Sequence, residues 1–286
     1  MKQDKSYDKM LNNINEYKKN ILLPDIQNNN TDIKLAINKV GITNIVMPVK
    51  ISTKCLHTIT STANFSIYVD LNKDQKGTHM SRFITKLQEY VNAPISSLSL
   101  KKVAKEICIK LESNKSFIEC SFKYFINKQA PISKLSGLMD YDVTFKVEYD
   151  NIENSYIFEM IIKIPVTAVC PCSKEIAIYG AHNQRGIITI SFIMNPDYNS
   201  IIWIEDIIKL AERCASCELY PILKREDEKF VTEQGYDNAN FVEDTVRKVA
   251  KEIDRFKADE QILNYRIESM NYESIHNHEA FAMIRG

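Results

Sequence analysis

SYIFEMIIKIPVTAV, residues 155–169, carries an apolar side chain at every second position from Phe158 to Ala168. Because alternate side chains of a strand point to the same face of a sheet, this pattern predicts a long strand with one buried face. A second strand pattern follows, then two helical patterns and two further strand patterns. These are GIITISFIMN (186–195), IWIEDIIKLAERCAS (202–216), ANFVEDTVRKVAKEIDRF (239–256), QILNYRIESMNY (261–272) and HEAFAMIR (278–285).

The first half of the chain repeats this order of elements. Its patterns run strand, strand, helix, helix, strand, strand over residues 33–51, 58–71, 77–91, 96–113, 116–126 and 141–149. We therefore predict an α+β fold of two tandem ββααββ modules, each an antiparallel sheet with its helix pair on one face. The polar segment DNIENS (150–155) marks the break, so the modules span 32–150 and 151–286. Residues 1–31 are rich in Asn, Lys and Asp and are interpreted as an N-terminal polar arm.

Composition limits the classes of protein that this chain fits. It has 286 residues, of which 44% are hydrophobic and 26% are charged, with a formal net charge of zero. This balance argues against a general affinity for nucleic acid or for an anionic membrane. Neither a secretory signal nor an apolar run of membrane-spanning length stands out, and seven cysteines without an export signal indicate reduced thiols. We therefore expect a soluble cytoplasmic protein.

One short polar stretch, AVCPCSKEIAIYGAHNQRG (168–186), holds the residues with the clearest chemistry. Cys170, Cys172 and His182 could supply thiolate and imidazole ligands to one Zn²⁺-class ion across a turn that contains Gly180. The alternative is a pair of buried thiols beside a surface histidine. A catalytic metal site has three protein ligands and leaves a position for water, so a third ligand is expected from elsewhere in the chain.

Two sources compete for that third ligand. Cys214 and Cys217 form a C-x-x-C that would close an inert four-thiolate site with the first pair of cysteines. The other source is a carboxylate from residues 217–237, which separate the two helical patterns of the second half and which we interpret as a functional loop. Glu218 begins this segment, and Glu233 lies further along it.

Several motifs resemble those of one enzyme family and occur in the family's order. They are GTHMSRF in the first half, then CPCSKEI, YGAHNQRG, LYPILKREDEKFVTE, NFVEDTVRKVA and ESIHNHEAFA. From about Val40 to the C-terminus the chain resembles the type IB family of GTP cyclohydrolase I, whereas the N-terminal arm lies outside the resemblance. The resemblance departs at Glu226, where the family's motif has proline.

This resemblance implies a tunnelling fold (T-fold), in which chains of two ββααββ modules assemble around a central channel. It implies a homotetramer with active sites shared between subunits. The implied reaction is hydrolysis of GTP to 7,8-dihydroneopterin triphosphate and formate, the entry step to folate and pterin biosynthesis. It also implies a divalent metal, with Zn²⁺, Mn²⁺ and Fe²⁺ left open because mixed sulfur, nitrogen and oxygen ligands suit more than one ion. Neither nucleic acid nor a membrane is an expected partner.

Matched to the family's motifs, Cys170, His182 and Glu218 resemble the metal ligands. Cys172 is either a spare thiol or an alternative ligand. His276 resembles a catalytic histidine, which completes the catalytic set with the cysteine and histidine of the metal site. Attack on carbon 8 of guanine requires an activated water and an acid that protonates nitrogen 7, and a histidine suits that acid.

Substrate recognition falls to other residues. Glu233 resembles the guanine anchor, whose carboxylate would accept hydrogen bonds from the ring N1–H and the 2-amino group. The triphosphate requires cations, for which the candidates are Lys174, Arg185, Lys224 and Arg225. The alternative is that the first two are solvated loop charges and that the last two pair with Asp227 or Glu228.

Two other functions remain as alternatives. The related preQ0 reductases share the T-fold and use a cysteine nucleophile, so a nitrile oxidoreductase is one of them. The chain has no Gly-rich dinucleotide fingerprint, and the cysteine–histidine cluster favours hydrolysis. The other alternative is a non-catalytic binding module with a structural four-cysteine zinc site.

Overall fold

The structure is a computed structural model that describes residues 25–198 and 200–286. Within this part, ten strands form one sheet in the order β10-β9-β7-β6-β5-β4-β2-β1-β3, and β8 pairs with β6 beside this path. Every pair is antiparallel except β1 with β3. The strands are β1 (Ile37–Ser52), β2 (Thr58–Leu71), β3 (Pro94–Ile95), β4 (Lys115–Gln129), β5 (Ser136–Asp150), β6 (Ser155–Val169), β7 (Asn183–Met194), β8 (Cys217–Glu218), β9 (Ile262–Asn271) and β10 (Ala280–Arg285). The helices are α2 (Met80–Gln88), α3 (Ser97–Leu111), α4 (Pro171–Ile176), α5 (Ile204–Cys214), α6 (Arg225–Asp237) and α7 (Val242–Ala258).

β4 shows why these segments form strands. Its residues Ile118, Cys120, Phe122 and Tyr124 are buried in the core, and more exposed residues alternate with them. Apolar and aromatic side chains at every second position suit a pleated surface with one buried face. The long strands predicted from this period are confirmed.

α3 shows why the helical segments form helices. Leu100, Val103 and Ile107 recur at helical spacing and are buried against the sheet. The helix begins with a capping box, in which Ser99 N donates to Ser96 Oγ at 3.1 Å and Ser96 N donates to Ser99 Oγ at 2.8 Å. None of the helices in the described ranges is long and apolar enough to cross a membrane.

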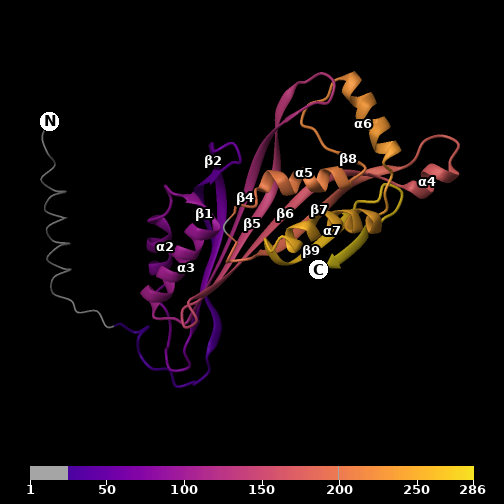
Figure 1. Ribbon diagram of the computed structural model, residues 1–286. Helices are drawn as coiled ribbons and strands as arrows, with labels where there is room; N and C mark the ends of the chain where they lie inside the picture. The colour runs from indigo at the N-terminus through magenta and orange to yellow at the C-terminus, as the bar shows by residue number, and fades with distance from the viewer. Residues whose placement is uncertain (1–24, 199) are drawn as a thin grey trace, which may run out of the picture.

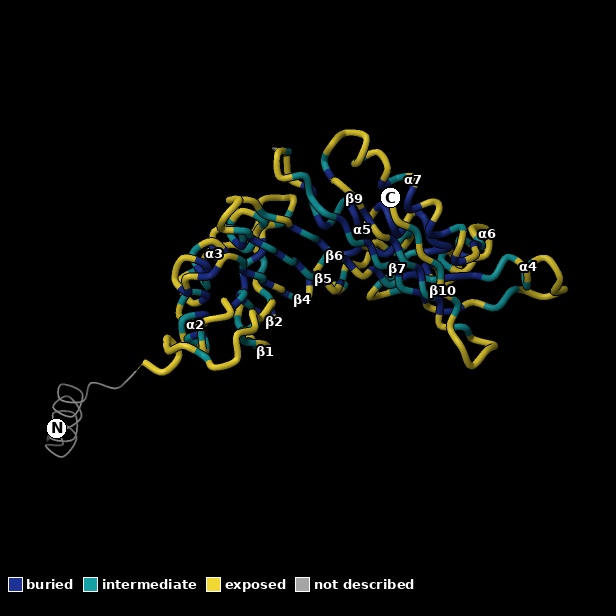
Figure 2. Tube along the Cα trace, turned by 90° about the horizontal axis from the view of Figure 1, so that it is seen from below, coloured by how far each residue is buried: buried dark blue, intermediate teal, exposed yellow. Residues whose placement is uncertain are grey.

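The long helices lie on one face of the sheet (Figure 1). α2 and α3 cover the strands of the first half, and α5 and α7 cover β6, β9 and β10. Buried residues run along the central strands beneath these helices, whereas the ends of the hairpins and the turn around α4 are exposed (Figure 2). The predicted α+β architecture with antiparallel strands is confirmed.

The sheet continues without interruption from the first half into the second. β5 and β6 form a hairpin whose turn occupies residues 151–154, where the break between modules is predicted. The division into an arm at 1–31 and modules at 32–150 and 151–286 stays a prediction. Most of the arm lies outside the described residues.

The sheet forks beyond the pair of Asp142 and Lys163. This is the last pair of β5 with β6, and from there the β4–β5 hairpin continues to its own end at Gln129 and Ser136. On the other arm of the fork, β6 pairs with β8 instead, at Val166. Figure 1 shows the β4–β5 hairpin extending away from β6 towards α6. β8 lies between this hairpin and β6.

Two helices were not predicted. The prediction of a loop over 217–237 is wrong in part, because α6 occupies residues 225–237. This helix has little apolar periodicity, and only Asp227 and Gly235 of its residues are buried. α4 is a short helix that begins at Pro171, a residue well suited to the first helical position. Both helices are held by contacts that sequence periodicity does not record.

Candidate functional site

The β6–β7 hairpin brings Cys170 and His182 together. Val169 and Asn183 are register partners at the end of this antiparallel pair, so the residue after the first faces the residue before the second. A backbone hydrogen bond from Cys170 N to His182 O, at 3.1 Å, closes the pair. α4 and the turn at 177–181 bridge the gap between the two residues in sequence.

Cys170 is the N-cap of α4 and is tied to its first turn. Ser173 N donates a hydrogen bond to Cys170 Sγ at 3.4 Å, and Ser173 Oγ donates to Cys170 O at 3.1 Å. The same hydroxyl accepts a hydrogen bond from His182 N at 3.2 Å. Cys170 is half-buried, whereas Cys172 on α4 is exposed. The structure thus holds one thiol at the start of α4, in the residue opposite the histidine, and leaves the other at the surface.

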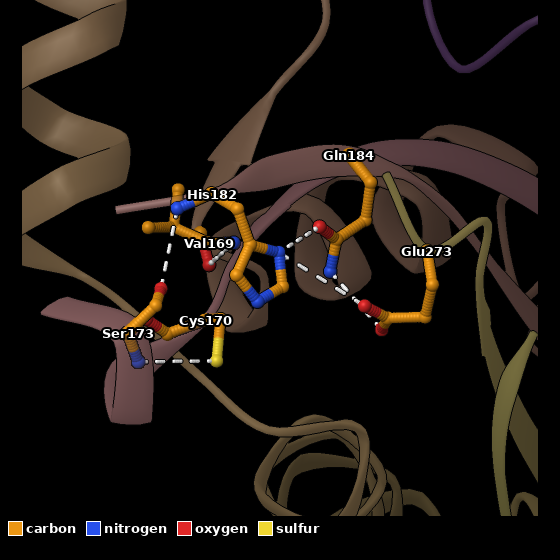
Figure 3. Close-up of polar contacts among 7 residues, drawn as sticks. Val169, Cys170, Ser173, His182, Gln184 and Glu273 are labelled. Carbon is orange, nitrogen blue, oxygen red and sulfur yellow. Dashed lines mark hydrogen bonds and ion pairs between the residues drawn. The ribbon is translucent and has the colours of Figure 1, made fainter. Parts of the chain in front are cut away.

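The imidazole of His182 is oriented by two polar neighbours (Figure 3). Gln184 Nε2 donates to Glu273 Oε1 at 3.2 Å, which leaves Gln184 Oε1 facing His182 Nδ1 at 2.9 Å. Because an amide oxygen only accepts, Nδ1 carries the proton in the neutral ring and Nε2 carries the lone pair. No hydrogen bond occupies Nε2 among the described residues, and Figure 3 shows it on the Cys170 side of the ring.

The connection between β9 and β10 lies beside this pair. Tyr272 N donates to Arg185 O at 2.9 Å, and Glu273 Oε2 lies 4.0 Å from the ring nitrogen of the site histidine. Three residues further on, His276 is exposed and stacks on His278, with ring centroids 4.8 Å apart. Within the described ranges, no hydrogen bond or ion pair joins His276 to the cysteine–histidine pair. The structure therefore places the loop that carries His276 next to the site.

Glu218 belongs to a second polar cluster, under the fork of the sheet. Its Oε2 lies 2.6 Å from Lys128 Nζ, and its Oε1 accepts a hydrogen bond from Tyr220 Oη at 2.7 Å. Lys128 is 8% exposed and also contacts Glu212 at 2.8 Å. Tyr141 Oη donates to that second carboxylate at 2.7 Å. A lysine from β4 of the first half thus holds two glutamates of the second.

The two carboxylates of this cluster differ in their electrostatics. Burial raises the pKa of Glu212 above its ordinary value, and the contact with Lys128 only partly offsets this effect. Burial also pushes the pKa of Glu218 upward, but hydrogen bonds from Lys128 and Tyr220 outweigh it, so this pKa lies below the ordinary value. Glu218 is therefore an anionic oxygen donor at neutral pH.

The structure does not gather Glu218 with the cysteine and the histidine. Within the described residues, no group of three or more His, Cys, Asp or Glu side chains is placed to hold one metal ion. Glu218 pairs with Val166, four positions before Cys170 on β6, which separates their backbones by about 13 Å. The four-thiolate alternative is not formed in this part of the chain either, and Cys214 and Cys217 are buried.

The buried lysine gives a testable consequence for stability. Lys128→Met leaves two carboxylates under the fork without their cation, so we expect the free energy of unfolding to fall by about 3–5 kcal/mol. Chemical denaturation measures this change. The double variant Lys128→Met/Glu212→Gln removes one of the stranded charges and is expected to recover part of the loss. Equal stability of the single and double variants would contradict this account.

The candidate substrate residues lie around α6. Glu233 has a side chain that is 64% exposed and an ion pair with Lys229 at 3.8 Å. Lys224 and Arg225, at the start of the helix, are exposed. The alternative in which these two pair with neighbouring carboxylates is not realised, because the described residues contain no such ion pair. Arg185 on β7 is exposed as well.

Lys174 is more constrained than a solvated loop charge. Its ammonium donates to Tyr236 O at 2.6 Å and lies 4.3 Å from the centre of the Tyr236 ring. This contact ties α4 to the C-terminal end of α6. The turn with the cysteine and the helix with the candidate guanine anchor are thereby joined.

Comparison with known proteins identifies the family. A family model described as type I GTP cyclohydrolase folE2 matches residues 23–282. The chain belongs to this folE2 family. It is 49% identical over 268 residues to GTP cyclohydrolase FolE2 of Aromatoleum aromaticum, covering 92% of this chain and 93% of the relative. The FolE2 protein of Azoarcus sp. is 47% identical over 265 residues, with 92% and 94% covered.

Solved structures show the fold of the folE2 chain. Uricase from Bacillus fastidious superposes with a TM-score of 0.53 at 9% identity, covering 90% of this chain and 94% of the uricase. Uricase from Arthrobacter globiformis gives a TM-score of 0.51 at 8% identity, with 90% and 96% covered. At such low identity the likeness concerns architecture alone. The predicted tunnelling fold is confirmed.

The family also decides the class of activity. The chain is an enzyme of the GTP cyclohydrolase I type, with GTP as its substrate, and it acts in folate biosynthesis. The predicted function is confirmed, and the nitrile oxidoreductase and the non-catalytic module are set aside. The matches name the folE2 group, whereas the subclass IB expected from the motifs is a finer statement than they make.

Sequence reasoning on the folE2 chain missed several residues that orient the site. Gln184 and Glu273 lie inside two of the motifs that carry the resemblance, AHNQR and ESIHNH. Gln184 shares a strand face with His182 because the two are separated by one residue, and that spacing was an available signal. Lys128 falls on the buried face of β4 by the same alternation, but a sequence does not show which charges meet it.

Proposed function

We propose that the chain hydrolyses GTP to 7,8-dihydroneopterin triphosphate and formate at the end of the β6–β7 hairpin. The observation that carries this proposal is the pairing of Cys170 with His182 across the hairpin, with Nε2 of the ring directed to the side of the thiol. A half-buried thiol and an oriented imidazole supply two of the three protein donors of a catalytic zinc-class site.

The donor types at the end of the hairpin fit a divalent metal, and within one chain the described residues supply two of the ligands. Cys170 and His182 would hold it, and Glu218 is proposed as the carboxylate ligand because it is anionic and retains lone pairs beyond its two hydrogen bonds. Cys172 is exposed and is not assigned a ligand role. When bound, a divalent metal supplies the Lewis acidity that makes water a nucleophile at neutral pH. The mixed donors suit Zn²⁺, Mn²⁺ or Fe²⁺.

The chain's own residues supply binding and proton transfer. Glu233 accepts hydrogen bonds from N1–H and the 2-amino group of guanine, a contact that adenine does not reproduce. His276 donates a proton to nitrogen 7 as water adds to carbon 8. The triphosphate binds the cations around α4, β7 and α6, namely Lys174, Arg185, Lys224 and Arg225.

A direct assay tests this function. The purified, metal-depleted protein is incubated with GTP and with each of a panel of divalent metals, and formate and the fluorescent pterin formed after oxidation are measured. We expect both products in a metal-dependent manner. Full activity that persists after chelation would overturn the metal-assisted hydrolysis.

Glu233 gives a specificity prediction. Glu233→Gln replaces one hydrogen-bond acceptor by a donor, so we expect kcat/KM for GTP to fall about 10- to 100-fold, the equivalent of one charge-assisted hydrogen bond. Discrimination against inosine triphosphate, which lacks the 2-amino group, should fall as well. Glu228→Gln, on an exposed position of the same helix, serves as the control. Unchanged discrimination in the Glu233 variant would argue against the anchor.

The resemblance to the type IB family also bears on the subclass, the location and the assembly of the protein. We infer that the chain belongs to subclass IB, that it acts in the cytoplasm, and that it assembles as a homotetramer with sites shared between subunits. The separation of Glu218 from the cysteine–histidine pair within one chain supports a site completed by a second copy. Sedimentation analysis of the purified protein measures the number of subunits.

A further inference from the structure

The tip of the β4–β5 hairpin, defined here as residues 130–137, contacts the segment that carries the substrate residues. Asp227 in the first turn of α6 is the centre of this contact. Its Oδ1 accepts hydrogen bonds from Ile132 N at 2.8 Å and from Ser133 N at 2.9 Å. Its Oδ2 accepts from Ser133 Oγ at 2.5 Å and from Lys224 N at 2.9 Å. One carboxylate therefore joins the tip to the start of α6.

Asp227 is fully buried in this contact. The residue is 0% exposed, although the residues around it on α6 face solvent. Burial pushes its pKa upward, but the hydrogen bonds from Ser133, Lys224 and Ile132 outweigh it and hold the pKa well below the ordinary value. A buried carboxylate that accepts four hydrogen bonds fixes the position of each donor.

The backbone of the tip also approaches the chain that leads into α6. A Cβ added to Gly137 would lie 2.9 Å from Pro221 Cγ and 3.1 Å from Ile222 Cδ1. Only glycine permits this approach without a shift of the neighbouring segment. The tip thus packs along residues 221–227, and its contact extends beyond Asp227.

The two ends of α6 are held by different parts of the molecule. At the C-terminal end, Gly235 lies against Val169 and Cys217, and Tyr236 O accepts the hydrogen bond from Lys174. At the N-terminal end, Ile132 and Ser133 of the tip hold Asp227 through hydrogen bonds. Because a helix is a stiff rod with a rise of about 1.5 Å per residue, fixing its first turn also fixes Glu233 about 9 Å further along.

We propose that the β4–β5 tip is a positioning element for substrate recognition, and that Asp227 is the positioning residue through which it acts. The tip sets the place of Lys224 and Arg225 directly and that of Glu233 through the helix. In this way the first half of the chain determines how the second half binds GTP. The inference rests on the proposed function, in which these three residues contact the substrate.

Kinetics of tip variants test the proposal on the full-length assembled protein. Asp227→Asn removes the anion and one acceptor, so we expect KM for GTP to rise about 10- to 100-fold, as for a misplacement of binding groups by about 1 Å. Because α6 carries binding groups and not the reacting ones, kcat should change far less. Ser133→Ala should raise KM in the same direction, and Ser133→Thr, which keeps the hydroxyl, should restore it. Glu228→Gln is the matched control on α6.

The outcomes are distinct. A rise in KM for Asp227→Asn and Ser133→Ala, with rescue by Ser133→Thr, supports the positioning role. A lower melting temperature with unchanged KM in both variants shows a structural role only and overturns it. If Asp227→Asn does not fold, the two Ser133 variants decide the question in the same way. A wild-type protein that yields no pterin with any metal would refute the proposed function instead.

Discussion

Cys170→Ala is expected to abolish formate release and to leave the purified protein without stoichiometric metal. The thiol and the His182 ring are the two proposed ligands that the hairpin places next to each other, so removal of the thiol leaves a single oriented ligand. Loss of an outer partner of a metal ligand costs about 10- to 100-fold in affinity or activity. Loss of the ligand itself should exceed this, and we expect at least about a 10³-fold fall in kcat/KM.

Cys172→Ala is the matched control for this change. Both thiols lie at the start of α4, separated by Pro171, but Cys172 is exposed and Cys170 is half-buried beside the histidine. The control variant should retain metal and activity. Elemental analysis after dialysis and the pterin assay measure both. A Cys170→Ala protein with full activity, or a Cys172→Ala protein without metal, would refute the ligand assignment.

His276→Ala is expected to lower kcat by about 10²- to 10⁴-fold, the usual contribution of a general acid. The residue lies on the β9–β10 connection, which Glu273 and Tyr272 tie to the strand that follows the site histidine. Because His276 is not a metal ligand in the proposed site, the metal content should stay at the wild-type level. KM for GTP should change little.

His278→Ala separates the acid from its neighbour. The two rings are stacked, so loss of either one removes the stacking contact, but only His276 is assigned the proton transfer. We expect the His278 variant to keep most of its kcat. A large loss in His278→Ala combined with a small loss in His276→Ala would transfer the role to the second histidine. Equal large losses would indicate that the stacked pair acts as a unit.

The outline of the fold could be predicted from the sequence, because strands and amphipathic helices leave a period in it. The alternation in β4 and the helical spacing in α3 record which side chains face the core. α6 was not predicted because it lacks such a period. Its residues are mostly exposed, so its polar sequence has no apolar face to display.

The candidate site, like the fold, could be predicted from the sequence only in part. The sequence determined the residue types of the chemistry, since two cysteines and a histidine within one polar turn already indicate a metal site. The hairpin register that sets Cys170 opposite His182 is local and follows from two paired strands. The sequence alone therefore identified the GTP cyclohydrolase family, and its assignment of the site residues stays a prediction.

Only the tertiary structure decided how the remaining groups are held. Ser133 and Asp227 meet although they lie 94 positions apart, and Lys128 meets Glu212 at a separation of 84 positions. Such contacts arise where the sheet forks and the β4–β5 hairpin crosses to the second half. A sequence pattern records which face of an element is buried. It does not record which distant charge a buried polar group will meet, because that partner is selected by the packing of the whole sheet and its helices.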